Sequence, residues 1–174
     1  FYNEGSCATI AAAWAAKSAQ CQWMTYGDSV VFHYSRQTGL LEHSFTRLAD
    51  FSNPPRLVSG KDPLEEEGFR SGIFHLDDTS VVFAASDALS HYVLMMYELS
   101  KSEEFESELM ELRMKQTSNS QLLQIAEKEK CNFAEDVLYP LLRSVDSEAN
   151  FKELMELLHT KRLIDIDDYT LAIL

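Results

Sequence analysis

Glycine, histidine and cysteine are scarce in this sequence, and their spacing excludes several familiar sites. The six glycines form neither a GxGxxG nor a Walker-type loop. The five histidines are scattered and the three cysteines form no CxxC pair, so neither HExxH nor a Cys/His zinc pattern occurs. A Gly-x-Ser-x-Gly elbow, which would mark a serine hydrolase, is also absent. None of these standard motifs therefore supplies the chemistry of this chain.

Basic residues are few as well, which bears on the class of partner. Fifteen Lys and Arg stand against 28 Asp and Glu, so the formal net charge is −13. Such a charge argues against binding nucleic acid or an anionic membrane through a basic surface. It is compatible with a phosphorylated substrate, because a bound divalent cation reverses the local field. Nothing in the sequence indicates an oligomeric state.

Long apolar runs are lacking too. None approaches the roughly 20 residues that a membrane-spanning helix needs. The alanine-rich stretch Ala8–Ala16 lacks the basic leader that precedes a signal-peptide core. Three cysteines are too few for a disulfide framework, which favours reduced thiols. We therefore predict a cytoplasmic protein.

The predicted type of secondary structure changes along the chain. Its 45% apolar and 25% charged residues are ordinary for a globular protein, and we expect residues 1–174 to form a single domain. Strand-like patterns extend to about Ser86, helical spacing follows from Asp87 to about His159, and a strand-like run closes the chain. The expected strands are Cys7–Ala16, Gln20–Tyr26, Val30–Tyr34, Ile73–Leu76, Ser80–Ala85 and Tyr169–Leu174. The expected helices are Asp87–Leu99, Phe105–Met114, a turn at Leu122–Ala126, Phe133–Leu142 limited by Pro140, and Phe151–Leu158 with Asn150 as its N-cap. These patterns predict an α/β fold.

Residues Thr46–Gly72 interrupt this regularity. The segment contains Pro54, Pro55 and Pro63 and the acidic run Glu65–Glu67. Long loops in compact domains are usually functional flaps or mobile segments. We interpret Thr46–Gly72 as a candidate flap.

Aspartates stand at the ends of several expected strands. Asp28 and Asp87 each follow an apolar strand, and Asp167 and Asp168 precede the closing one. Carboxylates at the ends of buried strands are held on a rigid scaffold and can converge on one point. Hard cations such as magnesium or manganese favour oxygen ligands of this kind.

Each aspartate also has a plainer interpretation. Gly-Asp-Ser around Asp28 is a common turn, and Asp87 is a favoured N-cap for the helix that follows it. Asp167 and Asp168 suit a solvated turn before an edge strand. On this interpretation the chain is an interaction domain, and its aspartates only cap a helix or form turns.

The order of these motifs resembles the protein phosphatase 2C family. In that family the later motifs read Gly-Asp-Ser, Ser-Asp-Gly and Asp-Asn/Asp-x-Thr/Ser, and Gly-Ser-x-Ala-Thr opens the middle strand. The corresponding residues here are Gly27-Asp28-Ser29, Ser86-Asp87-Ala88, Asp167-Asp168-Tyr169-Thr170 and Gly5-Ser6-Cys7-Ala8-Thr9. The resemblance runs from about Gly5 to Leu174 and covers the C-terminal two-thirds of the family's domain.

The resemblance implies both a fold and a reaction. The fold would be a layered α-β-β-α sandwich of two mainly antiparallel sheets with flanking helices, incomplete at the N-terminus. The reaction would be metal-dependent hydrolysis of phosphoserine or phosphothreonine on a phosphoprotein substrate, in signalling, by a water activated by two or three magnesium or manganese ions. Asp87 and Asp167 would bind the two principal ions, and Asp28 with Asp87 would bind a third. Asp168 would be a neighbour rather than a ligand, and His91, one helical turn after Asp87, is expected to approach the site.

Two departures from the family keep two functions open. The upstream Asp-Gly-x-Gly motif, which supplies a bridging aspartate, has no counterpart, nor has the phosphate-contacting arginine. Either those parts lie upstream of Phe1 in a longer protein, or this polypeptide is not an active enzyme. Ala88 stands where the family usually has glycine, which is tolerable in a helix and strained at positive φ. The chain is thus either part of an active phosphatase or a catalytically inactive pseudophosphatase that acts as a binding or regulatory module, and Thr46–Gly72 would be the flap.

Overall fold

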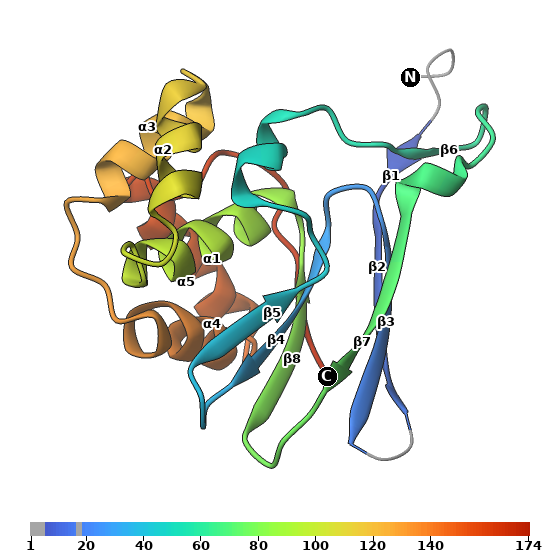
Figure 1. Ribbon diagram of the computed structural model, residues 1–174, viewed down its shortest axis with the longest axis horizontal. Coiled ribbons are helices and arrows are strands. Elements are labelled where there is room, and N and C mark those ends of the chain that lie inside the picture. The colour runs from blue at the N-terminus through green and yellow to red at the C-terminus, as the bar shows by residue number, and fades with distance from the viewer. Residues whose placement is uncertain (1–5, 17–18) are drawn as a thin grey trace. The chain divides into compact units, whose positions relative to one another are not determined.

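The computed structural model describes residues 6–16 and 19–174 (Figure 1). Gly5 of the Gly-Ser-x-Ala-Thr motif lies outside the described residues, and so do Lys17 and Ser18 between the first two expected strands. The chain divides into two compact units. The first unit comprises Phe1–Phe45, Pro54–Ser86 and Ala172–Leu174, and the second comprises Thr46–Asn53 and Asp87–Leu171.

The first unit is built from β-sheets. One sheet has the strand order β2-β3-β7, another has the order β5-β4-β8-β9, and β1 pairs with β6 (Figure 1). The pairs β2–β3, β3–β7, β4–β5 and β4–β8 are antiparallel. The strands are β1 Cys7–Ala8, β2 Ile10–Ala16, β3 Gln20–Tyr26, β4 Val30–Ser35, β5 Leu40–His43, β6 Val58–Ser59, β7 Phe69–His75, β8 Ser80–Ala85 and β9 Leu171–Ile173. A short 3-10 helix, η2, spans Glu66–Gly68.

An apolar core lies between the two larger sheets. Side chains alternate between the faces of a strand, so Cys21 of β3 and its cross-strand neighbour Phe74 of β7 point to the same face. They meet Val31 of β4 and Val82 of β8 in one buried cluster. The expected α/β class with two mainly antiparallel sheets is confirmed.

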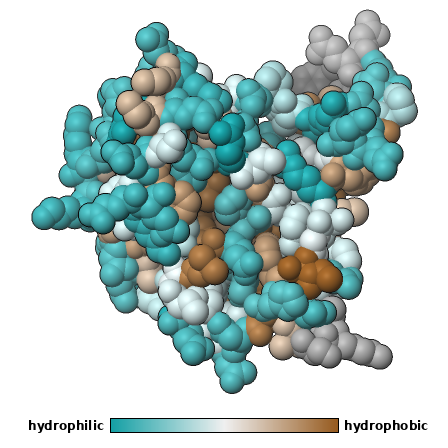
Figure 2. All heavy atoms as spheres, viewed as in Figure 1, coloured by the Kyte–Doolittle hydropathy of each residue, from teal (hydrophilic) through white to brown (hydrophobic). Residues whose placement is uncertain are grey.

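The second unit is helical. Its elements are η1 Leu48–Ser52, α1 Asp87–Ser100, α2 Glu106–Met114, α3 Ser118–Ala126, the π-helical turn η3 Phe133–Leu138, α4 Tyr139–Ser144 and α5 Glu148–Thr160. Every residue of α1 from Ala88 to Glu98 is buried, and η1, α3 and η3 pack against this helix. Hydrophilic residues dominate the face of the helices seen in Figure 2. No helix in the described part of the chain is long and apolar enough to cross a membrane.

The cap of α5 and the place of Pro140 differ from the sequence prediction. The α5 helix begins at Glu148, and Ser147 is its N-cap, because the Ser147 Oγ accepts a hydrogen bond of 3.2 Å from the Asn150 amide. Asn150 is therefore inside the first turn and not the cap. Pro140 lies in the first turn of α4 and does not end a helix. A proline is tolerated there because the amides of the first turn need no partner within the helix.

The segment Thr46–Gly72 does not form one continuous loop. Its first part, Thr46–Asn53, contains η1 and belongs to the second unit, whereas the rest belongs to the first. The strand expected at Ile73 already begins at Phe69, which pairs with Tyr26 of β3. The closing strand β9 is shorter than predicted.

Candidate functional site

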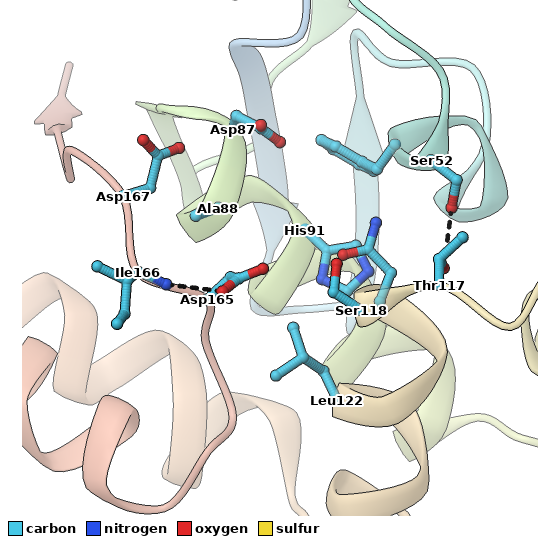
Figure 3. A pocket seen from close by; sticks show the side chains of 12 residues that line it. Ser52, Asp87, Ala88, His91, Thr117, Ser118, Leu122, Asp165, Ile166 and Asp167 are labelled. Atoms are coloured by element: carbon cyan, nitrogen blue, oxygen red, sulfur yellow. Dashed lines mark hydrogen bonds between the residues drawn. The ribbon is translucent and has the colours of Figure 1, made fainter.

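A cavity of about 330 Å³ lies at the N-terminus of α1 (Figure 3). Its lining comes from the end of η1, the first two turns of α1, the first turns of α3 and the loop before β9, all within the second unit. The lining residues are Phe51, Ser52, Asp87, Ala88, His91, Thr117, Ser118, Asn119, Leu122, Asp165, Ile166 and Asp167. Helix packing thus gathers four separate segments around one space.

One wall of this cavity is acidic. Asp87 is the first residue of α1, and Asp165 and Asp167 lie on the loop between α5 and β9. In Figure 3, Asp87 and Asp167 lie on the same side of the cavity. The loop is held locally, because Asp165 Oδ1 accepts from the amide of Ile166 at 2.9 Å and Asp167 Oδ1 accepts from that of Asp168 at 2.8 Å. Asp87 and Asp167, expected as the principal metal ligands, therefore line the same pocket.

Ala88 adopts the backbone conformation that suits alanine. It lies in α1 and is buried. The described non-glycine residues with positive φ are Ala19, Gln116 and Arg162, so Ala88 is not among the strained positions. Replacement of the family's usual glycine at this position therefore introduces no backbone strain.

His91 lies one helical turn after Asp87 and lines the cavity. It is 3% exposed, and its ring meets that of Phe51 edge to face, with 5.5 Å between centroids. Its Nε2 atom has no hydrogen-bond partner among the described residues. Burial lowers the pKa of His91 to about 4, against the opposing effect of the Asp165 carboxylate. The imidazole is therefore uncharged at neutral pH.

The wall formed by α3 is polar and carries no charged side chain. Thr117 is the N-cap of α3, but its side chain makes no capping hydrogen bond. Its Oγ1 instead lies 3.4 Å from Ser52 Oγ of η1. Ser118 and Asn119, in the first turn of α3, complete this wall. An uncapped helix N-terminus carries partial positive charge on its amides.

Asp165 and the first turn of α3 were not among the site residues predicted from the sequence. The alternate spacing Asp165-x-Asp167 was a usable signal for a pair of carboxylates on one loop. The run Thr117-Ser118-Asn119 was a signal for a helix N-terminus. That these two segments line the same cavity follows only from the packing of the helices.

Asp28 and Asp168 have different surroundings. Asp28 belongs to the first unit, in the turn between β3 and β4, and is half-buried. Asp168 is exposed on the loop before β9, and its backbone amide contacts Asp167. A role for Asp28 at a third ion stays a prediction, and so does the place of Asp168 beside the ligands.

Two of the family-like motifs interlock within the first unit. Gly27 has φ of +92°, and a Cβ added there would lie 2.6 Å from Thr9 Cγ2 and 2.8 Å from the carbonyl oxygen of Arg56. Thr9 Oγ1 is also 2.6 Å from Ser29 Oγ. Glycine is therefore required before Asp28 by both backbone conformation and space.

The donor set of the acidic wall suits a hard divalent cation. No three His, Cys, Asp or Glu side chains within residues 6–16 and 19–174 are grouped so that they could hold a metal ion on their own. Magnesium, however, usually keeps several waters and binds through one or two carboxylates. Asp87 and Asp167 fit that role, with water molecules completing the shell.

Comparison with known proteins gives no match to a protein-family model, to a curated protein or to a solved structure. The functional assignment therefore depends on the residues themselves.

Proposed function

We propose that this chain is part of a phosphatase that hydrolyses phosphoserine or phosphothreonine on cytoplasmic phosphoproteins, with magnesium or manganese as cofactor. The observation that carries the proposal is the meeting of Asp87 and Asp167 in one cavity. These are the two positions at which the resemblance to the protein phosphatase 2C family requires ligands. The interlocked Thr9, Gly27 and Ser29 give further support, because they belong to two other motifs of that resemblance.

The chain's own residues would have defined tasks in this reaction. Asp87 and Asp167 would hold the cation through their carboxylates, and α1 and the loop before β9 would position them. When bound, the cation would lower the pKa of a water molecule and neutralise charge on the phosphoryl oxygens. His91, buried and uncharged, would line the cavity without adding a positive charge.

A second function is favoured by a specific observation. The described residues offer no group of three metal-binding side chains, and the sequence lacks the Asp-Gly-x-Gly motif. A pseudophosphatase that binds a partner or a ligand in the same cavity is consistent with both. Metal binding and catalysis must therefore be measured separately.

The decisive experiment uses Asp87→Asn. Manganese binding is measured by calorimetric titration, and phosphate release from a phosphoserine peptide is measured with the full-length protein. We expect Asp87→Asn to weaken manganese binding by more than about tenfold, because one charged ligand is lost, and to abolish phosphate release. Asp146→Asn, which changes an exposed aspartate of the same unit, should leave both unchanged.

The outcomes separate the two functions. Manganese binding without phosphate release in the full-length protein would favour the pseudophosphatase. Phosphate release that survives Asp87→Asn, or that needs no metal, would contradict the proposed metal site.

A further inference from the structure

The wall of the cavity formed by Ser52, His91 and the first turn of α3 has properties that the acidic wall lacks. It carries hydroxyl groups on Ser52, Thr117 and Ser118, and its helix N-terminus is left without a side-chain cap. In the same cavity, the buried His91 has an unpartnered Nε2 atom. Buried polar atoms of proteins are nearly always hydrogen-bonded, so an open ring nitrogen beside an uncapped helix points to a missing ligand.

The chemistry of this wall selects an anion with several oxygens. Amide groups at a helix N-terminus donate hydrogen bonds and carry partial positive charge, a combination that binds phosphate and other oxyanions. Hydroxyl groups can donate to the same oxygens. A neutral imidazole whose Nε2 carries the proton can donate as well, and the first turn of α3 carries no Lys or Arg that would replace these donors.

We propose that Ser52, His91 and the first turn of α3 form the subsite for the phosphoryl group of the substrate. The inference rests on the proposed function, because it names which part of the same cavity receives the phosphoester. The phosphoryl group would lie between a cation at Asp87 and Asp167 and the amides of Ser118 and Asn119. In Figure 3 Asp87 and Asp167 lie on a different side of the cavity from Ser118, with Asp165 drawn between them and His91 beside Ser118 in this view.

The acidic wall imposes a condition on this subsite. Asp87, Asp165 and Asp167 together would repel a phosphate that approaches an empty cavity. A divalent cation on the aspartates removes that repulsion. Phosphate should therefore bind much more tightly after the cation than before it.

The test measures binding and not turnover. Inorganic phosphate is titrated into the 174-residue chain with and without saturating magnesium, by calorimetry and by the amide NMR shifts of Ser118 and Asn119. The variant Ser118→Pro removes one amide donor at the first helical position, where proline is well tolerated. The preceding residue, Thr117, already has the extended backbone that a following proline requires. Ser118→Ala is the matched control, since it removes the hydroxyl group but keeps the amide.

A second pair of variants tests His91 independently. His91→Gln keeps an N–H donor at a similar distance from the backbone, whereas His91→Phe keeps the ring volume without a donor. We expect Ser118→Pro and His91→Phe each to weaken phosphate binding in magnesium by about tenfold, the effect of one lost hydrogen bond to a charged group. Ser118→Ala and His91→Gln should retain affinity within about threefold.

The result also distinguishes this inference from the proposed function. If magnesium binds and Asp87→Asn abolishes that binding, but phosphate affinity is the same in all four variants, the subsite is wrong and the metal site stands. If magnesium does not bind, the proposed function fails. The subsite then still stands if millimolar phosphate shifts the Asn119 amide in the parent and not in Ser118→Pro, and it is overturned otherwise. Absence of phosphate binding to the magnesium-loaded chain also overturns it.

Discussion

Two buried histidines, His33 in the first unit and His91 in the second, differ in whether their ring nitrogens are hydrogen-bonded. Each residue is 3% exposed. In the first unit, His33 Nδ1 lies 2.7 Å from Glu42 Oε2, and Nε2 lies 2.7 Å from Ser80 Oγ. In the second unit, His91 Nε2 has no partner among the described residues. Both histidines are buried, but only His91 lines a described cavity with an unused hydrogen-bonding atom.

This difference in hydrogen bonding distinguishes a structural histidine from a histidine that is a candidate for ligand binding. Glu42, His33 and Ser80 form a chain with the spacing of a hydrolase triad, yet its members come from the paired strands β5, β4 and β8. Ser80 Oγ also lies 3.3 Å from the carboxylate of Asp77, which would repel a developing negative charge on a substrate oxygen. These hydrogen bonds therefore connect the side chains of neighbouring strands and have a structural role. An unsatisfied group at a cavity is the better sign of a binding site.

The largest expected effect tests how tightly the first unit is packed. Gly27→Ala places a Cβ against Thr9 and the backbone of Arg56 at a positive φ. We expect the free energy of unfolding, measured by urea denaturation, to fall by about 3 kcal/mol. Gly60→Ala is the control, because nothing lies within 4 Å of its added Cβ, and it should change stability by less than about 0.5 kcal/mol. Equal effects at the two glycines would contradict the close contact at Gly27.

The next prediction compares the two histidines directly. His33→Phe leaves Ser80 and Glu42 without the imidazole that joins them, and we expect a loss of about 2 kcal/mol in the free energy of unfolding. His91→Phe removes an atom that has no protein partner and should change stability by less than about 1 kcal/mol. Urea denaturation of both variants is the measurement. Similar losses would remove the distinction between the two sites.

A smaller effect, an increase in the free energy of unfolding, is expected for a substitution in the second unit. Glu98 of α1 is 3% exposed, and burial, with a contribution from Glu108, raises its pKa to about 8. The folded chain therefore holds a proton that the unfolded chain releases above its ordinary pKa of 4.5. Stability should fall as the pH rises from about 4.5 to about 8. Glu98→Gln should abolish this decline and stabilise the protein at pH 8 by about 1–2 kcal/mol.

The measurement is urea denaturation at pH 5 and at pH 8. The exposed Glu106 provides the control, because Glu106→Gln should leave the difference between the two pH values unchanged. A parent protein that is equally stable at both pH values would contradict the buried, protonated state of Glu98.

The smallest effect is expected at Asp77, whose pH response is the reverse of that of Glu98. Hydrogen bonds from Ser35 and then from Thr79 lower the pKa of Asp77 to about 2. The carboxylate contributes stability above its ordinary pKa of 3.8, and this contribution is lost as the pH falls to about 2. Asp77→Asn should be slightly less stable than the parent at pH 6, and acid denaturation curves should converge near pH 2. A gap that widens with acidification would contradict this.

Much of the fold was predictable because periodicity is a local property. The apolar runs Gln20–Tyr26 and Ser80–Ala85 correspond to β3 and β8 at their observed bounds, and Asp87 begins α1 as expected. The N-cap of α5 was mispredicted because Ser147 and Asn150 are both good caps. In the structure the Ser147 Oγ accepts a hydrogen bond from the Asn150 amide, so Ser147 is the cap. The pattern of residue types alone does not choose between the two.

The sequence by itself determined the aspartates at strand ends, the glycine before Asp28 and the scarcity of basic groups. Tertiary structure alone decided that Asp165 and the first turn of α3 line the same cavity as Asp87 and Asp167. The physical reason is that capping, turn geometry and charge depend on neighbours along the chain. A cavity instead depends on how separate helices pack, and so does the choice of which buried histidine keeps an open nitrogen.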